Sequence, residues 1–310
     1  MKLSFRNLLR HGLLLSLFAT TSCASSTTPP SLALAPIVPG GSTSFLNHVE
    51  QVNQKILLSE GKAFARIHEK SKPVFVLLHG LSDSPGTVAD LASFFEQDSS
   101  SVLAPILSGH GVKPEDLAEV DLAMWRSDVD TALGAALEIS GGRPIVLVGF
   151  STGAALAVDA LQRHGTSQFA RVILVAPLLG FRRNILIKMA SFLGLFKSYF
   201  GGGQDSSVGY EKIHINGILQ TRTLVSEIDD YWRLNKIRIP IFTASSELDA
   251  VVSQSALDEF IRVQNVPESR IVKFPKSLGV RHQRVPRSIS ESARESSAEF
   301  REKLRNFVSN

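Results

Sequence analysis

The chain is poor in the residues that build cross-links and metal centres. Cys23 is the single cysteine among 310 residues, so an intrachain disulfide framework is excluded. The sequence has no H-E-x-x-H segment and no cysteine pair, so no metal-binding spacing stands out. It also lacks a phosphate-binding loop and a dinucleotide fingerprint. We therefore expect a function that needs no metal and no cofactor.

Net charge is also small once the N-terminus is set aside. The formal charge is +4, and Lys2, Arg6 and Arg10 lie within residues 1–22, which contain no acidic residue. The rest of the chain therefore has a formal charge of +1. A nearly neutral domain gives no electrostatic reason to expect nucleic acid as a partner.

Residues 1–22 have the pattern of a signal peptide. The basic start is followed by the apolar run 13–19, which is too short for an ordinary membrane span. Cys23 follows small residues directly after this run, so the segment looks like a bacterial lipoprotein signal whose cysteine is lipidated and holds the protein to a membrane. Plain secretion with cleavage near Ala24 is the alternative. Residues 23–46 are rich in Ser, Thr, Pro and Ala and are expected to form a flexible tether.

The residue after Cys23 favours one location in the bacterial cell envelope. Ala24 stands where enteric lipoproteins that stay in the inner membrane carry an aspartate. The sequence therefore favours an outer-membrane lipoprotein, with a secreted or periplasmic protein as the alternative.

Residues 47–310 are expected to form one large domain. The chain is 44% hydrophobic, enough for a sizeable core, and no internal repeat is visible. Strand-like and helix-like segments alternate, which favours an α/β fold with a mostly parallel sheet and helices on both faces. Strands are expected near 62–68, 73–79, 102–106, 144–149, 171–176, 239–244 and 270–274, and helices near 86–97, 122–138, 152–164, 253–264 and 290–307.

The most informative motif is GFSTG at residues 149–153. An apolar run typical of a buried strand precedes it, and the segment after it reads as a helix. This strand-turn-helix context is what a nucleophile elbow requires, because the glycines allow a tight turn that turns Ser151 outward. An ordinary glycine-rich turn is the alternative. The pattern predicts Ser151 as a catalytic nucleophile.

A serine nucleophile needs a base and an acid that orients the base. Asp249 lies in the loop after the expected strand 239–244, and His282 lies beyond the last expected strand. Asp249 is therefore the predicted acid, with Glu247 as its substitute, and His282 is the predicted base. The alternatives are a helix N-cap for Asp249 and an ordinary surface histidine in a basic loop.

The oxyanion of an acyl-transfer reaction needs backbone N–H donors. One is expected from Thr152, directly after the nucleophile, and the other from Leu81 in the loop after the strand near 73–79. Gly80 allows the backbone to approach a substrate closely. His79 is expected to be structural, hydrogen-bonded within the loop.

In combination, these motifs resemble the serine hydrolases of the α/β-hydrolase superfamily. The similarity is greatest to the monoacylglycerol lipase, lysophospholipase and carboxylesterase branch, grouped as serine aminopeptidase-like hydrolases. It implies an α/β-hydrolase fold with a helical cap insert, and esterase or lipase chemistry on acyl esters. One departure is the segment 275–281, since relatives usually carry the histidine soon after the last strand. The resemblance covers roughly residues 60–308 and is carried by 79–81, 109–111, 149–153, 249–252 and the pair Trp125 and Asp128.

About sixty residues separate the expected strands at 171–176 and 239–244, far more than an ordinary connection. We expect a cap insert at about 178–238, whose first part, 181–200, is apolar with only positive charges. This composition favours a lid over an acyl pocket. Its lysines are expected to be solvated rather than bound to a membrane.

The sequence therefore predicts a serine hydrolase that cleaves carboxylic esters of small-molecule acyl or lipid substrates. An acyltransferase or a serine peptidase with the same triad is the alternative within enzymes. A degenerate hydrolase that serves as a binding protein of the cell envelope is the alternative outside them. The oligomeric state is left open.

Overall fold

The computed structural model describes residues 37–68, 72–182, 199–201, 207–290 and 297–309. The predicted signal peptide and Cys23 lie outside these residues, as does most of the apolar part of the cap insert. Among the residues that the structure describes, no helix combines the length and the apolar content needed to cross a bilayer.

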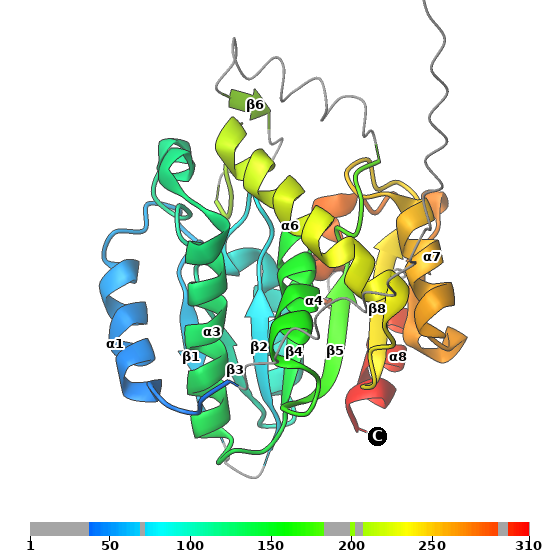
Figure 1. Ribbon diagram of the computed structural model, residues 1–310, viewed down its shortest axis with the longest axis horizontal. Coiled ribbons are helices and arrows are strands. Elements are labelled where there is room, and N and C mark those ends of the chain that lie inside the picture. The colour runs from blue at the N-terminus through cyan, green and yellow to red at the C-terminus, as the bar shows by residue number, and fades with distance from the viewer. Residues whose placement is uncertain (1–36, 69–71, 183–198, 202–206, 291–296, 310) are drawn as a thin grey trace, which may run out of the picture. The chain divides into compact units, whose positions relative to one another are not determined.

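A seven-stranded sheet in the order β1-β3-β2-β4-β5-β8-β9 forms the centre of the domain (Figure 1). Strand β1 is antiparallel to its neighbour and the other neighbours are parallel, which confirms the predicted mostly parallel sheet. The strands of this sheet are β1 (Phe64–Arg66), β2 (Val74–Leu78), β3 (Ser101–Ala104), β4 (Ile145–Phe150), β5 (Phe169–Val175), β8 (Ile241–Ser246) and β9 (Ile271–Phe274).

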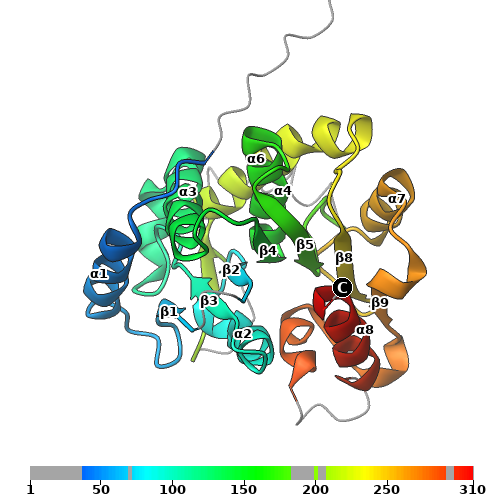
Figure 2. The same cartoon turned by 90° about the horizontal axis from the view of Figure 1, so that it is seen from below.

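Helices cover both faces of the sheet (Figure 2). One face carries α1 (Ser42–Asn53), α3 (Leu122–Ile139), α4 (Thr152–His164), α6 (Ile215–Leu234) and α7 (Gln254–Gln264), and the other carries α2 (Ala89–Glu96) and α8 (Ser297–Ser309). The short 3-10 helices are η1 (Pro85–Val88), η2 (Pro114–Glu119), η3 (Glu268–Arg270), η4 (Lys276–Leu278), η5 (His282–Arg284) and η6 (Pro286–Ile289).

The central strands of the sheet are buried on both faces because alternate side chains enter different cores. Along β2, Val74, Val76 and Leu78 join the apolar cluster under α3 and α4. Phe75 and Leu77 join the cluster under α2 and α8. This two-sided burial explains why the strands are nearly continuous apolar runs rather than alternating patterns.

The predicted tether at residues 23–46 is wrong for its last part. Helix α1 begins at Ser42, and Phe45 is only 2% exposed in the core. Upstream of the helix, the Ile37 N–H donates to Gln168 Oε1 at 2.6 Å, and the Gly40 N–H donates to the Gly134 carbonyl at 3.1 Å. Composition misled the prediction, because the serines and threonines before Phe45 open an amphipathic helix rather than continue a linker.

The predicted cap insert at 178–238 contains fewer cap residues than expected, because part of this range belongs to the main domain. Helix α6 packs along α4 as part of the helical layer, and its Trp232 is fully buried against Phe260 of α7. The described remainder of the insert includes a hairpin of β6 (Tyr199–Gly201) and β7 (Lys212–His214). Residues 183–198 and 202–206 lie outside the described part.

The burial of Phe45 yields a stability prediction. Phe45→Ala removes a large side chain from the core and is expected to lower the free energy of unfolding by about 3 kcal/mol. Urea denaturation measures this loss, and Leu46→Ala, whose side chain is 37% exposed, is the matched control with an expected loss below about 1 kcal/mol. Equal, small effects in both variants would show that α1 contributes nothing to the folded domain.

Candidate active site

Ser151 occupies a strained turn between β4 and α4. Its backbone has φ 55° and ψ −116°, values that L-residues rarely adopt. Neither flanking glycine has a left-handed φ, so glycine is not required there for its backbone conformation. It is required because a side chain would not fit. A Cβ on Gly149 would lie 2.4 Å from the Gly153 carbonyl oxygen, and one on Gly153 would lie 2.2 Å from the Leu78 carbonyl oxygen. Strand, helix and neighbouring strand are therefore packed backbone to backbone around the serine, as in a nucleophile elbow.

The topology brings Ser151, Asp249 and His282 to the same edge of the sheet. They follow β4, β8 and β9, which run parallel, so all three lie beyond carboxyl ends of strands. His282 Nε2 lies 2.9 Å from Ser151 Oγ, and His282 Nδ1 lies 2.6 Å from Asp249 Oδ2. The three side chains predicted as nucleophile, base and acid thus form one hydrogen-bonded chain.

Asp249 is held rigidly in this chain. It is fully buried, and its Oδ1 accepts hydrogen bonds from the N–H groups of Val251 at 2.8 Å and Val252 at 3.0 Å. Its Oδ2 is left to accept from the imidazole. Arg182 also donates to the Asp249 carbonyl at 2.5 Å, a contact that no sequence motif predicts. The alternative acid, Glu247, instead accepts from the Lys276 N–H at 3.2 Å.

The long loop before His282 is tied back to the sheet. The Ser246 hydroxyl, at the end of β8, donates to the Val280 carbonyl. Gly279 adopts a left-handed turn with φ 65°, which glycine allows without strain. The Phe150 and His282 rings then pack 5.1 Å apart, between centroids. These anchors explain how a histidine so far beyond β9 still reaches Ser151.

Two buried histidines fix the loop that carries Leu81. His79 Nε2 accepts from the Leu107 N–H at 3.1 Å, so its Nδ1–H donates to the Gly80 carbonyl at 2.9 Å. His110 Nε2 lies 2.6 Å from the Leu81 carbonyl oxygen. Burial lowers the pKa of His110. Burial and the nearby His110 together lower the pKa of His79 well below its usual value. His79 is therefore structural, as predicted, and His110 joins it.

The predicted oxyanion donors are free to bind. In the part of the chain that the structure describes, the N–H groups of Leu81 and Thr152 donate no hydrogen bond. The loop before them approaches the serine closely, since a Cβ on Gly80 would lie 3.2 Å from Ser151 Cβ. Two backbone donors beside a serine hydroxyl are what a tetrahedral oxyanion requires.

Asp83 is a carboxyl at this site that the sequence analysis missed. It lies two residues beyond Leu81 and is 3% exposed, and its N–H donates to the Gly80 carbonyl at 3.2 Å. Burial raises the pKa of Asp83 to about 6, while the nearby His282, the Thr87 hydroxyl and Arg287 act in the opposite direction. Its position directly after the predicted oxyanion loop was the available signal.

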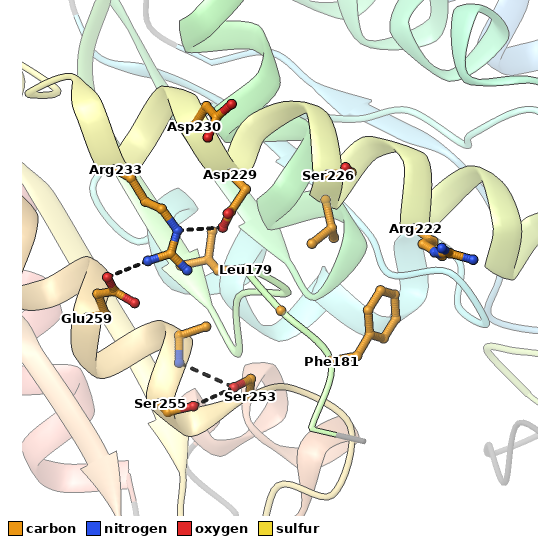
Figure 3. A pocket seen from close by; sticks show the side chains of 13 residues that line it. Leu179, Phe181, Arg222, Ser226, Asp229, Asp230, Arg233, Ser253, Ser255 and Glu259 are labelled. Carbon is orange, nitrogen blue, oxygen red and sulfur yellow. Dashed lines mark hydrogen bonds and ion pairs between the residues drawn. The ribbon is translucent and has the colours of Figure 1, made fainter. Parts of the chain in front are cut away.

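A cavity of about 540 Å³ lies between α6, α7 and the segment 179–181 (Figure 3). Its charges largely neutralise one another, since Arg233 pairs with Asp229 at 2.9 Å and also with Glu259. Ser151, Asp249 and His282 do not line it. Within the described ranges, no group of three His, Cys, Asp or Glu side chains is placed to hold a metal ion.

Comparison with known proteins gives a family model that matches part of the chain and a shared fold. Residues 69–204 match the family model described as serine aminopeptidase, S33, and none of the curated proteins matches the chain. The fold resembles that of a metagenome-derived lipolytic enzyme of the LipS and LipT study, with 17% identity, a TM-score of 0.67, and 81% of this chain and 98% of that chain covered.

Two monoacylglycerol lipases have the same fold. The enzyme of Paleococcus ferrophilus is 15% identical, with 80% of this chain and 99% of that chain covered and a TM-score of 0.60. The soluble variant of the Saccharomyces cerevisiae enzyme is 14% identical, with 80% and 90% covered and a TM-score of 0.61. The predicted α/β-hydrolase fold is therefore confirmed, and with it the resemblance of this chain to the S33 serine aminopeptidase-like branch of the α/β-hydrolases.

Proposed function

We propose that this protein is a serine hydrolase that cleaves carboxylic esters through an acyl-enzyme. The observation that carries the proposal is the pair of hydrogen bonds made by His282, at 2.9 Å to Ser151 Oγ and 2.6 Å to Asp249 Oδ2. A serine hydroxyl is a weak nucleophile unless a base accepts its proton, and this imidazole is placed to accept it.

In the proposed mechanism, Ser151 Oγ attacks the ester carbonyl carbon while its proton moves to His282 Nε2. Asp249 accepts the Nδ1–H and stabilises the imidazolium. The N–H groups of Leu81 and Thr152 bind the oxyanion. The leaving alcohol then takes the proton from Nε2, and an acyl group remains on Ser151. Water, deprotonated by His282, attacks this acyl-enzyme and releases the acid.

Acyl or lipid esters are the proposed substrates. The apolar composition of residues 181–200 favours an acyl-binding lid, and two proteins of the same fold are monoacylglycerol lipases. The family description, serine aminopeptidase, favours a peptidase as the second candidate. Amides and acceptor alcohols, tested beside esters, separate hydrolysis of esters from peptidase and acyltransferase activity.

We also propose that the mature protein is a lipoprotein of the bacterial cell envelope, attached to the membrane through Cys23. The basic start, short apolar run and cysteine of the N-terminus support this proposal. No nucleic acid is proposed as a partner.

The nucleophile is tested by Ser151→Ala. The variant removes the attacking oxygen and is expected to lower kcat/KM by more than about 10³-fold on p-nitrophenyl esters from acetate to palmitate, with an unchanged melting temperature. Ser255→Ala, an exposed serine on α7, is the matched control and is expected to retain wild-type activity. Turnover near the wild-type level in Ser151→Ala would disprove the assignment, and a folded but inactive wild type would favour a binding protein.

The acid is tested by two isosteric variants, one at Asp249 and one at Glu247, which lie close together in the sequence but have different hydrogen-bond partners. Asp249→Asn removes the carboxylate that holds the imidazole and is expected to lower kcat/KM by about 10³- to 10⁴-fold. Glu247→Gln leaves that contact intact and is expected to change kcat/KM less than about twofold. Steady-state kinetics on one p-nitrophenyl ester decide between them, and the reverse ranking would make Glu247 the acid.

The anchor is tested by Cys23→Ser in the full chain. Without the thiol no lipid can be attached, so the protein is expected to move from the membrane fraction to the soluble fraction and to lose labelling by a palmitate analogue. The esterase activity of the released protein serves as the control for folding. Continued membrane recovery without lipid labelling would contradict the lipoprotein assignment.

A further inference from the structure

The carboxyl group of Asp83 has a hydrogen-bonding capacity that the fold does not use. The Thr87 hydroxyl donates to Oδ1 at 3.2 Å. Oδ2 accepts no hydrogen bond from any residue that the structure describes, although Asp83 is only 3% exposed. A carboxylate that is almost wholly shielded from solvent and has a single side-chain donor is costly to keep ionised, so its presence at this place requires a reason.

The place of this oxygen is the active site itself. A Cβ on Gly80 would lie 2.5 Å from Asp83 Oδ2, 3.2 Å from Ser151 Cβ and 3.3 Å from Phe150 Cε1. Roughly the space of one methyl group therefore separates the carboxylate from the nucleophile. Phe150 in turn packs on the His282 ring. The turn 80–83 thus places the Asp83 carboxylate close to Ser151, whose hydroxyl is hydrogen-bonded to His282.

Charges reach Asp83 from two elements packed around it. His282 on η5 and Arg287 on η6 are the charged groups that act electrostatically on its carboxylate, and the Thr87 hydroxyl on η1 donates to it. Since burial brings the pKa of Asp83 to about 6, the side chain is mainly an anion at pH 7 and mainly neutral at pH 5. An anion in this buried setting interacts strongly with a positive charge on His282.

We propose that Asp83 is a second carboxylate that serves His282, a positioning residue that stabilises the imidazolium formed when Ser151 gives up its proton. Asp249 holds the imidazole by a direct hydrogen bond, whereas Asp83 acts through space from the side of the oxyanion loop. This inference rests on the proposed esterase function and assigns Asp83 no contact with substrate.

Asp83→Asn tests the proposal through the pH profile of kcat/KM on a p-nitrophenyl ester. With a less stable imidazolium, the plateau is expected about threefold below wild type, and the acidic midpoint is expected about half a pH unit lower. At about pH 5 and below, wild-type Asp83 is itself mainly protonated, so the two profiles should converge there. KM should be unchanged. Asp90→Asn is the matched control, because Asp90 faces Arg287 but not His282, and its profile should equal that of wild type.

Thr87→Val is the second variant and covers the case in which Asp83→Asn does not fold. Loss of the hydroxyl raises the pKa of Asp83, so the acidic fall of the profile should begin at higher pH, opposite to the shift in Asp83→Asn. A uniform loss at all pH values, an unshifted midpoint, or a rise in KM with unchanged kcat would each overturn the proposal.

Failure of the proposed function is recognised separately. If the folded wild type hydrolyses no ester, the pH titration of the His282 ring is followed by NMR in wild type and Asp83→Asn. The proposal expects a midpoint about half a pH unit lower in the variant. Equal midpoints would overturn it, whatever the activity.

Discussion

The close packing of backbone around Ser151 is the constraint on which the site depends. Gly149 and Gly153 let β4, α4 and the end of β2 meet at distances that no Cβ could occupy. This packing forces Ser151 into its strained conformation and presents the Thr152 N–H at the start of α4. It also brings the loop after β2, with Gly80, against the serine. The proposed nucleophile and both proposed oxyanion donors are thus fixed by one set of backbone contacts, and the two cores beneath the sheet keep them in place.

Buried polar groups then complete what backbone packing begins. His79, in the loop after β2, accepts a hydrogen bond from the Leu107 N–H in the loop after β3. His110 belongs to the same loop after β3, and its Nε2 lies within hydrogen-bonding distance of the Leu81 carbonyl oxygen. Trp125 and Asp128 of α3 bind the same loop through the carbonyl and N–H of Ser108. Because each donor meets an acceptor among buried and partly buried residues, these bonds resist displacement and hold the loop that carries Leu81.

Local patterns predicted the parts of the site that are local in the chain. The strand, turn and helix around Ser151 and the loop at Gly80 could be predicted because glycine spacing and apolar runs fix them. The path by which the loop after β9 brings His282 to Ser151 could not be predicted, since it depends on a hydrogen bond from Ser246 to the Val280 carbonyl, between segments far apart in the chain. Helix α1 is not predicted by composition, because a segment rich in serine and threonine indicates a linker, whereas burial of Phe45 in the core holds this segment as a helix.

The two carboxylates that we assign to His282 differ in a way that suits different tasks. Asp249 accepts two backbone N–H groups on one oxygen and the imidazole on the other, so its charge is compensated by fixed donors and its geometry is set. Asp83 has one weak donor, and its charge is balanced mainly through space by His282 and Arg287. A carboxylate with full hydrogen bonding orients a base at every pH near neutrality. A carboxylate with little hydrogen bonding, such as Asp83, contributes an electric field that weakens when the carboxylate takes up a proton.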